Sequence, residues 1–533
     1  MVISSDGIVA SEHPLASAVG ARILAQGGSA VDAAIATNAV MGLVAPMMNG
    51  IGGDLFAIVY DAKADRLFGL NASGWAPQGL SIEFLRSHGE TAMPLYGIHS
   101  VTVPGAVAGW AALHQRFGSR PLTELLAPAI HYARAGFPVS ERTSAWWADY
   151  AESGPRDADA AALYLPGGRA PRAGERFRNP DLAGSLEQIA AHGSRAYYEG
   201  AIAERILNTS AAHGGTMVRA DLAEFSPEWV EPLSTDYRGW TVYELPPNEQ
   251  GIAALEMLNM LETFPLASWG HNSPATLHAH IEAKKLAYAD LIQYVGDPRR
   301  TQIPVAGLLD KGYARSRAAL IDPAHAHCEV VAGTPPRGGD TTLLTVVDRA
   351  GNMVALIQSN YEEFGSGVVV AGAGFVLHDR GALFTLEPGH PNSLAPRKRP
   401  LHTIIPAFMS RGQDKIAFGV MGGWNQAQAH VQFVSNVVDF GMNIQQAIDA
   451  PRYTKRTFAG CDVQIEDRVP PDTRAALTAR GHVLTVQGAY SESMGGAQAV
   501  RRDFASGINF GASDPRKDGA AIPEVYAVGK LSP

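Results

Sequence analysis

The sequence predicts a layered α/β protein, because helical patterns fill its first part and strand patterns follow a polar connection. Helical stretches recur between residues 16 and 295, whereas alternating apolar runs dominate from Thr341 onward. Residues 329–340, EVVAGTPPRGGD, separate the two parts, and their glycines and prolines are typical of a flexible linker. A chain of 533 residues is also too long for one ordinary hydrophobic core. We therefore predict an internal boundary between Asp340 and Thr341.

The elements before the boundary follow from local signals. Residues 16–26 predict a helix that Gly27 and Gly28 end, and Ser29 is a suitable N-cap for a second helix over 30–44. Residues 49–73 predict a glycine-rich turn and a hairpin of two apolar strands. Further helices are expected at 105–117, 122–135, 181–192, 201–213, 252–263 and 275–295.

After the boundary the pattern changes to strands. The predicted strands cover 341–347 and 353–359, joined by a turn, and then 403–409 and 415–421. Gly422 and Gly423 follow the last strand and lead into a helix, which is a β-to-α turn.

Composition excludes several classes of protein. A formal net charge of -9 gives no basic surface for nucleic acid. The most apolar early run, residues 35–48, is interrupted and too short to span a bilayer, and the first residues lack a secretory signal. Two cysteines, Cys328 and Cys461, exclude a disulfide scaffold and suit a reducing compartment. We therefore expect a cytoplasmic protein with no membrane or nucleic-acid partner.

Other kinds of site have weak signals. Two groups of possible metal ligands occur, one with His278, His280 and Glu282 and one in HAHC at 325–328. Histidines two residues apart lie on different faces of a helix, and no second ligand pair has metal-site spacing, so we expect no metal. Residues 365–374 lack the Lys-Ser/Thr of a P-loop, and no Gly-x-Ser-x-Gly pentapeptide occurs.

Thr341 offers a different nucleophile. A cut between Asp340 and Thr341 would give the threonine a free α-amine as its own general base. Such an amine titrates at about 7.7–8.0, close to the value that a base needs at neutral pH. The Thr341 hydroxyl could make the cut itself by attacking the preceding carbonyl. The N–H groups of Gly422 and Gly423 could stabilise an oxyanion, although without Thr341 an ordinary β-to-α turn would be the preferred interpretation of these glycines.

Taken in order, these segments resemble the γ-glutamyltranspeptidase family of N-terminal nucleophile hydrolases, over most of the chain. The segments that carry the resemblance are ASAVGARILAQGGSAVDAAIA, NGIGGDLF, SVTVPGAVAGW, EAKKLAYADLIQYVGDP, GGDTTLLTVVDRAGNMVALIQSNYEEFGSG, KRPLHTIIPAF and GVMGGWNQAQAHVQFVSNVVDFGMNIQQAIDAPR.

The resemblance implies a four-layer αββα sandwich that is made as a proenzyme. It implies self-cleavage into intertwined subunits 1–340 and 341–533, which remain a heterodimer or pair into a dimer of heterodimers. Thr341 would be the nucleophile, Ser359 the second hydroxyl that hydrogen-bonds it, and the Gly422/Gly423 backbone the oxyanion hole. No metal or organic cofactor is implied.

The departures from the family pattern fall among substrate-binding residues. Members that bind γ-glutamyl groups hold the α-carboxylate with an arginine and the ammonium with an aspartate. In this chain the replacements are Ser73 for the arginine, Tyr361 for an asparagine, Arg380 for a glutamine, Leu383 for the aspartate, and His402 for the first of two serines, with Thr403 keeping the second hydroxyl.

These departures predict a changed substrate. Without the aspartate a glutamyl ammonium would be unpaired in a closed site, which costs several kcal/mol, so glutathione should be a poor substrate. Arg380 could bind a small carboxylate, unless it forms a structural ion pair, and Tyr361 and His402 could line the pocket. The oxamate amidohydrolase branch has this chemistry. The alternatives are a glutathione hydrolase or γ-glutamyltransferase with a rebuilt pocket, a cephalosporin-type acylase, and a catalytically inert relative.

Overall fold

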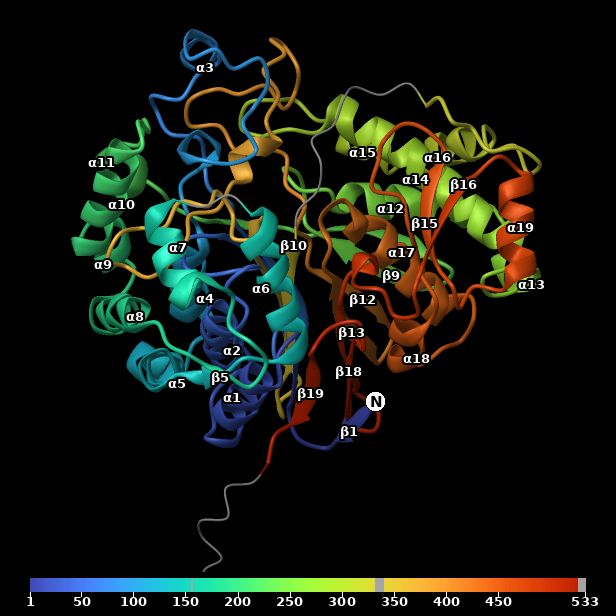
Figure 1. Cartoon of the computed structure of the whole chain (residues 1–533). Helices are drawn as coiled ribbons and strands as arrows, with labels where there is room; N and C mark the ends of the chain where they lie inside the picture. The colour runs from blue at the N-terminus through green and yellow to red at the C-terminus, as the bar shows by residue number, and fades with distance from the viewer. Residues whose placement is uncertain (155–156, 331–339, 526–533) are drawn as a thin grey trace, which may run out of the picture.

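The structure is a computed structural model that describes residues 1–154, 157–330 and 340–525. Two antiparallel seven-stranded sheets stack face to face at its centre (Figure 1). The predicted linker at 329–340 falls mostly on residues 331–339, which lie outside the described residues.

The sheet that contains the predicted boundary has the order β19-β2-β10-β11-β3-β4-β7. Its central strands are β10 (Asp340–Val347) and β11 (Met353–Tyr361), which pair with each other. Both predicted subunits supply strands to this sheet, since β10, β11 and β19 follow the boundary and β2, β3, β4 and β7 precede it. The other members are β2 (Ile8–Ser11), β3 (Asp54–Asp61), β4 (Arg66–Ala72), β7 (Glu228–Val230) and β19 (Ala520–Pro523).

The second sheet has the order β1-β18-β17-β13-β12-β9-β8. A cluster of buried residues fills the space between the sheets, with Leu343 and Ile357 from one and Phe408 and Val500 from the other. The strands are β1 (Val2–Ser4), β8 (Leu233–Tyr237), β9 (Trp240–Glu244), β12 (Ala407–Arg411), β13 (Asp414–Val420), β17 (Ala497–Asp503) and β18 (Ile508–Ser513).

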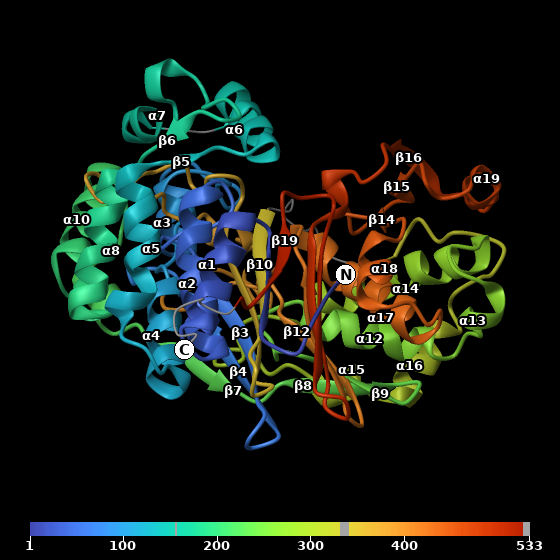
Figure 2. The ribbon, with the colours of Figure 1, turned by 90° about the horizontal axis from the view of Figure 1, so that it is seen from below.

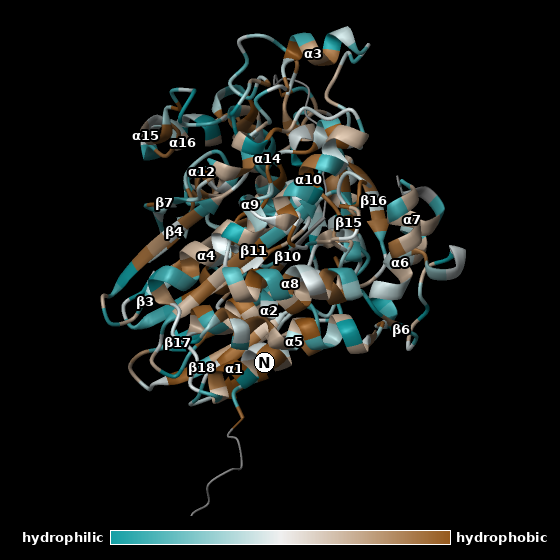
Figure 3. Cartoon of the chain, turned by 90° about the vertical axis from the view of Figure 1, so that its left-hand side faces the viewer, coloured by the Kyte–Doolittle hydropathy of each residue, from teal (hydrophilic) through white to brown (hydrophobic). Residues whose placement is uncertain are grey.

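Helices cover the outer face of each sheet, which makes the four-layer αββα sandwich (Figure 2). Over the first sheet lie α1 (Pro14–Ala25), α2 (Ala30–Val44), α4 (Ala106–Phe117), α5 (Leu122–Ala135) and α8 (Pro180–His192). Over the second lie α12 (Gly251–Leu261), α14 (Pro274–Tyr294), α17 (Gln426–Val438) and α18 (Ile444–Asp449). The outer helices α5 and α8 carry hydrophilic and hydrophobic residues side by side, as expected of helices with one buried face (Figure 3).

Smaller elements surround the sandwich. They are α3 (Ile82–Ser87), β5 (Phe137–Pro138), α6 (Glu141–Ser153), α7 (Ala158–Tyr164), β6 (Arg176–Phe177), α9 (Arg195–Tyr198), α10 (Ala201–Ala212), α11 (Arg219–Ala223), α13 (Leu266–Trp269), α15 (Val305–Leu308), α16 (Lys311–Ala318), β14 (Tyr453–Thr454), β15 (Asp462–Glu466), α19 (Pro471–Ala479) and β16 (Val483–Gln487).

Most predicted elements agree with the structure, and one strand differs. Ser29 caps α2 through a capping box with Asp32, as the sequence predicts. The strand predicted at 403–409 begins only at Ala407, directly after Pro406. Proline cannot donate to a ladder, and the carbonyl of Thr403 accepts a side-chain hydrogen bond from Gln250 instead.

Two further predictions, on membrane-spanning segments and on the cysteines, can be compared with the structure. Among the described residues, no helix is both long and apolar enough to cross a membrane. Cys328 and Cys461 form a disulfide, in contrast to the reduced thiols that their small number suggested.

Candidate active site

The predicted cleavage point lies at the start of β10, in the middle of its sheet. Asp340 pairs with Tyr361 and Thr342 pairs with Gln358, so two residues of β11 stand opposite Thr341. A bulge of this kind interrupts the ladder and changes the direction of a side chain, and bulges are frequent next to active sites. The backbone of Thr341 therefore occupies an irregular position, while the side chains of residues 340–342 lie outside the described part of the structure.

Ser359 occupies the neighbouring strand, and its hydroxyl accepts a hydrogen bond from the N–H of Tyr361 at 2.8 Å. Both side chains are fully buried. The glycine-rich turn before β3 packs directly on this part of β11, since a Cβ on Gly53 would lie 2.4 Å from the Ser359 carbonyl oxygen. Only glycine permits that approach. The turn that the sequence predicts thus positions Ser359 and the residue that begins β3, Asp54.

Asp54 is the centre of a buried polar cluster that sequence reasoning missed. Its carboxylate lies 2.9 Å from Nε2 of His402 and 3.5 Å from Nδ1 of His378, and it accepts the N–H of Gly74 at 3.0 Å. Burial raises the pKa of Asp54, but His378, His402 and Arg380 outweigh that effect and lower the pKa below its usual value. Asp54 is therefore an anion. The acidic residue directly after NGIGG was the signal available in the sequence.

His402 is a neutral, fully buried imidazole. Burial, and then the charge of Arg380, lower its pKa to about 3. Its Nε2 therefore carries the proton that it donates to Asp54, and its Nδ1 is an acceptor. The ring also packs edge-on against Phe56, with centroids 4.8 Å apart. The ionised carboxylate fixes both the tautomer and the orientation of this ring.

Arg380 begins a short 3-10 turn, Arg380–Leu383, and is completely buried. Its Nη1 donates to the hydroxyl of Thr403 at 2.7 Å, and its guanidinium lies 4.5 Å from the ring centre of Tyr361. Its Nε and Nη2 have no acceptor among the described residues. Burial lowers the pKa of Arg380 to about 10, which still leaves it charged at neutral pH. A buried cation with two free donors is suited to an anionic ligand.

The ring of Tyr361 packs against the guanidinium of this arginine. Its backbone has a φ of 80°, a left-handed conformation that is rare for an aromatic residue and that often marks a functional site. Burial raises the pKa of its phenol well above the usual value, so the ring remains neutral. The turn at the end of β11 therefore directs the aromatic face toward the guanidinium.

Ser73 ends up beside the same cluster, at the C-terminal end of β4. Its hydroxyl donates to Asn71 at 2.7 Å, and it also contacts Asn248. The backbone carbonyl of Asn248 accepts the N–H of His402 at 2.7 Å. Ser73 is thus linked through one asparagine to His402, and the five predicted substrate-binding residues form one buried, connected group.

Gly422 and Gly423 follow β13 and begin a second 3-10 turn, Gly423–Asn425, that leads into α17. Their φ values are 124° and 58°, which only glycine adopts without strain. Because they start a helical segment, their N–H groups have no helical acceptors. Gln250 donates to the Gly423 carbonyl at 2.8 Å and to the Thr403 carbonyl at 2.5 Å, which ties this turn to the rest of the site.

The glycine turn and the start of β10 belong to facing sheets. A Cβ on Gly419, near the end of β13, would lie 2.8 Å from the Leu343 side chain. Leu343 is two residues after Thr341, so the beginning of β10 crosses the end of β13 that the two glycines follow. This arrangement brings the predicted nucleophile and the predicted oxyanion donors to the same region.

A different cluster could hold a metal. His278, Glu282 and His482 offer ligand atoms that lie within 4.8 Å of one another. The sequence placed His278, His280 and Glu282 in one possible group. In the structure, His278 and Glu282 lie four residues apart on α14, and His482 from a distant segment takes the place of His280. Lys285 donates to Glu282 at 2.6 Å and so supplies a positive charge to that carboxylate.

Two stacked sheets between helical layers, with a threonine at the start of a central strand, have the architecture of N-terminal nucleophile hydrolases. Comparison with known proteins places the chain more narrowly. It belongs to the gamma-glutamyltranspeptidase family, whose description matches residues 16–524. Family and fold together define a hydrolase of amide C–N bonds.

Several relatives match over nearly the whole chain. A glutathione hydrolase-like proenzyme of Bacillus subtilis, YwrD, is 38% identical over 98% of this chain and 99% of its own. The oxamate amidohydrolase proenzyme of Klebsiella pneumoniae is 35% identical over 97% and 98%. The crystal structure of a cephalosporin acylase from Bacillus halodurans superposes with a TM-score of 0.92, at 41% identity, over 98% of this chain and 96% of that one.

Proposed function

We propose that the protein cleaves itself between Asp340 and Thr341 and then hydrolyses a small amide that carries a carboxylate next to the scissile bond, such as oxamate. The observation that carries this proposal is Arg380, a buried cation whose Nε and Nη2 have no acceptor among the described residues. The relatives that are proenzymes, one of them an oxamate amidohydrolase, support the same assignment.

Self-cleavage would use the nucleophile that it later exposes. The Thr341 hydroxyl adds to the carbonyl of Asp340, the C–N bond breaks, and the acyl group moves from nitrogen to oxygen. Water then hydrolyses the ester, which leaves a carboxylate on Asp340 and a free amine on Thr341. The bulge in β11 opposite Thr341 supports this step, because it interrupts the regular ladder at the backbone position where the chain would be cut.

Amide hydrolysis would follow the same chemistry on a bound substrate. The α-amine of Thr341 removes the hydroxyl proton, the oxygen attacks the amide carbon, and the N–H groups of Gly422 and Gly423 stabilise the oxyanion. The amine returns the proton to the leaving nitrogen, and ammonia departs. Water then attacks the acyl ester and releases oxalate from oxamate. Ser359 holds the nucleophilic hydroxyl through a hydrogen bond.

The charges around Arg380 favour a carboxylate over a γ-glutamyl head. An α-ammonium would lie near a buried guanidinium. Burial raises the pKa of Asp379, the acid beside Arg380, to about 8, which weakens its negative charge at neutral pH. Two further acids act on Arg380, namely Asp54, which already interacts with His378 and His402, and Glu362. An ammonium placed against the guanidinium would lose its hydration and be repelled by the like charge.

A second candidate is an acylase that acts on larger amides. The cephalosporin acylase structure favours it, with 41% identity and a TM-score of 0.92. Both candidates use the same nucleophile and differ in the size of the group that the pocket accepts. A catalytically inert relative would remain one uncut chain.

A panel of substrates on the processed enzyme tests the proposal. Ammonia release is measured from oxamate and from oxamide, which has the same size and no carboxylate, and aniline release from a γ-glutamyl anilide. We expect turnover of oxamate at least about 100-fold above oxamide, since two charge-assisted hydrogen bonds are lost. Strong anilide turnover without oxamate turnover would contradict the proposed substrate. N-terminal sequencing of the smaller fragment should begin at Thr341.

A further inference from the structure

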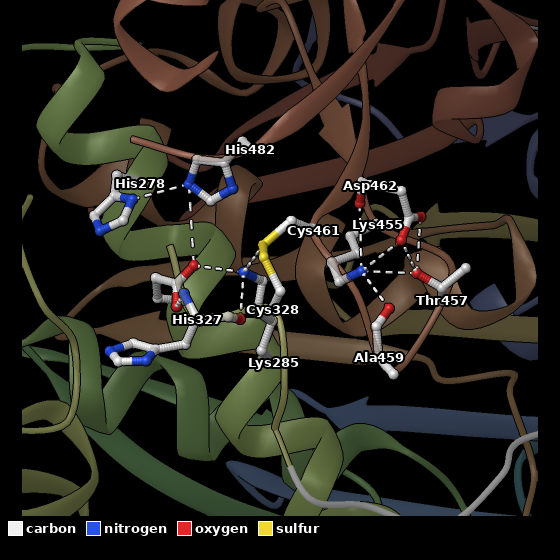
Figure 4. The surroundings of a disulfide bond; sticks show 11 residues. His278, Lys285, His327, Cys328, Lys455, Thr457, Ala459, Cys461, Asp462 and His482 are labelled. Carbon is white, nitrogen blue, oxygen red and sulfur yellow. Dashed lines mark hydrogen bonds and ion pairs between the residues drawn. A yellow bond between two sulfur atoms is a disulfide. The ribbon is translucent and has the colours of Figure 1, made fainter. Parts of the chain in front are cut away.

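Cys328 and Cys461 form a disulfide that crosses the predicted subunit boundary (Figure 4). Cys328 lies twelve residues before Asp340, near the end of the large subunit, whereas Cys461 precedes β15 in the small subunit. The two are 133 residues apart in sequence, with Cα atoms 4.7 Å apart. A cut between Asp340 and Thr341 would therefore leave the two subunits joined by this bond.

We propose that the Cys328–Cys461 disulfide is a covalent link between the processed subunits, and that it can be opened by small thiols. The covalent link between subunits rests on the proposed processing site. The opening of the bond by small thiols rests on the surroundings of the two cysteines. The link retains the end of the large subunit at the small subunit.

Backbone contacts position the segment that contains Cys328. The carbonyl of Cys328 accepts the N–H of Gly460 at 2.8 Å, and the N–H of Ala326 donates to the Arg480 carbonyl at 2.7 Å. Between them, His327 donates its N–H to Glu282 of α14 at 3.1 Å. The segment thus lies between α14 and the small subunit, and these hydrogen bonds hold it there in addition to the disulfide.

The loop that carries the buried cysteine is held independently by two lysines. Lys455 is buried and donates to the Thr457 hydroxyl at 2.7 Å, the Ala459 carbonyl at 3.0 Å and the Asp462 carboxylate at 3.0 Å. Lys284 of α14 donates to the Thr457 carbonyl at 2.7 Å. The loop should therefore keep its shape when the disulfide is reduced, so that the bond can form again.

The two cysteines differ in accessibility and in electrostatic surroundings. Cys328 is exposed, whereas Cys461 is only 6% exposed. The ammonium of Lys285 lies 3.7 Å from the sulfur of Cys461, and its side chain is 1% exposed. It also donates to the His327 carbonyl at 2.9 Å and to Glu282 at 2.6 Å, which fix its position. A cation held next to a sulfur stabilises the thiolate.

These differences set the direction of thiol exchange. A small thiolate attacks the sulfur of Cys328, a new S–S bond forms there, and Cys461 leaves as a thiolate beside Lys285. A second thiol then attacks the mixed disulfide, which releases the oxidised reductant and the Cys328 thiol. The protein gains two electrons and two protons, and the two small thiols lose them. A small-molecule disulfide reverses the sequence.

Denaturing electrophoresis tests the covalent link. Protein purified without reductant is treated with an alkylating agent and run with and without dithiothreitol. We expect one band near 56.5 kDa without reductant and two bands with it, because only the disulfide joins the fragments. A Cys328→Ser variant should give two bands in both lanes, and an uncut Thr341→Ala variant one band in both. Two bands from the wild type without reductant would overturn the link.

Counting thiols separates this inference from the proposed processing. The unreduced, denatured wild type should contain no alkylated cysteine, and the reduced protein two. A single band with reductant, together with no free thiol before reduction, would refute the processing site and leave the disulfide intact. Two alkylated cysteines before reduction would refute the disulfide whether or not the chain is cut.

The role of Lys285 is tested by the rate of reduction in dithiothreitol. Removing the lysine alone would leave Glu282 as a buried unpaired charge, so the double variant Glu282→Gln/Lys285→Met keeps the cluster neutral. We expect its disulfide to be reduced about tenfold more slowly, since the leaving thiolate loses its cation. Lys285→Arg keeps the charge and should retain the wild-type rate. Equal rates for the double variant and the wild type would exclude this role.

Discussion

At the scale of single residues, the site contains two charged side chains, Arg380 and Asp54, that are fully buried. Arg380 is buried, and two of its donors have no acceptor in the part of the chain that the structure describes. Asp54, although buried, remains ionised because two histidines and Arg380 surround it. Burial of an unpaired cation destabilises a folded protein, and this is why we propose an anionic ligand at Arg380. The sequence placed Arg380 among the departures from the family, but its burial depends on the loops that close around it.

We predict that Arg380→Met lowers kcat/KM for oxamate by about 100-fold, mainly through KM, because the substrate carboxylate loses two charge-assisted hydrogen bonds. The free energy of unfolding should remain within about 1 kcal/mol of the wild type, since the lost hydrogen bond to Thr403 is offset by removal of a buried charge that has no salt bridge among the described residues. Steady-state kinetics and urea denaturation measure the two effects. Arg380→Lys, which keeps the charge and loses the fork, should give an intermediate kcat/KM. A large loss of stability with little change in KM would instead indicate a structural ion pair.

At the scale of elements, close backbone approaches determine where the catalytic strands meet. Gly53 allows the turn before β3 to contact the Ser359 carbonyl, and Gly74 allows the end of β4 to approach Val103. The sequence identified a glycine-rich turn but could not show which backbone it approaches, since that partner is about 300 residues away. The helix bounds were easier to predict, because caps such as Ser29 act within a single turn.

We predict that Gly53→Ala destabilises the fold by about 2–3 kcal/mol, because its Cβ would lie 2.4 Å from a backbone oxygen. Gly184→Ala is the matched control. Gly184 lies inside α8, its Cβ would meet no atom within 4 Å, and alanine is the better helix former there. The control should therefore gain up to about 1 kcal/mol. Chemical denaturation measures both, and equal stabilities of the two variants would show that the turn packs loosely on β11.

At the scale of the whole molecule, pH acts on two opposing sets of buried groups. Burial lowers the pKa of His280 and His402 to about 3, so these imidazoles stay neutral in the fold. Burial also raises the pKa of Glu249 and Glu256 well above the usual value, so these carboxyls stay protonated. On acidification the histidines of the unfolded chain take up protons, which lowers the free energy of unfolding. The carboxyls of the unfolded chain also become protonated, as they already are in the fold, so the cost of burying Glu249 and Glu256 disappears and the free energy of unfolding rises. The net pH dependence is therefore smaller than either set alone would give.

Substitution of one buried histidine separates the contribution of the histidines from that of the carboxyls. Both ring nitrogens of His280 lack partners among the described residues, so we predict that His280→Leu is tolerated at pH 7.5. The lowered pKa means that stability present above about pH 6.5 is lost as the pH falls toward 3. At pH 5.0 the variant should gain about 2 kcal/mol relative to wild type, measured against the difference at pH 7.5. An unchanged difference would show that His280 is solvated or paired.

The sequence by itself determined the helices, the hairpins, the family and the residues that depart from its pattern, because caps, turns and apolar periodicity act over a few residues. Only the tertiary structure decided which of those residues meet. Ser73, Tyr361, Arg380 and His402 come from separate segments, and Asp54 joins them, because two stacked sheets bring distant strand ends to one place. Burial and charge at each position follow from that packing. The same packing joins Cys328 to Cys461.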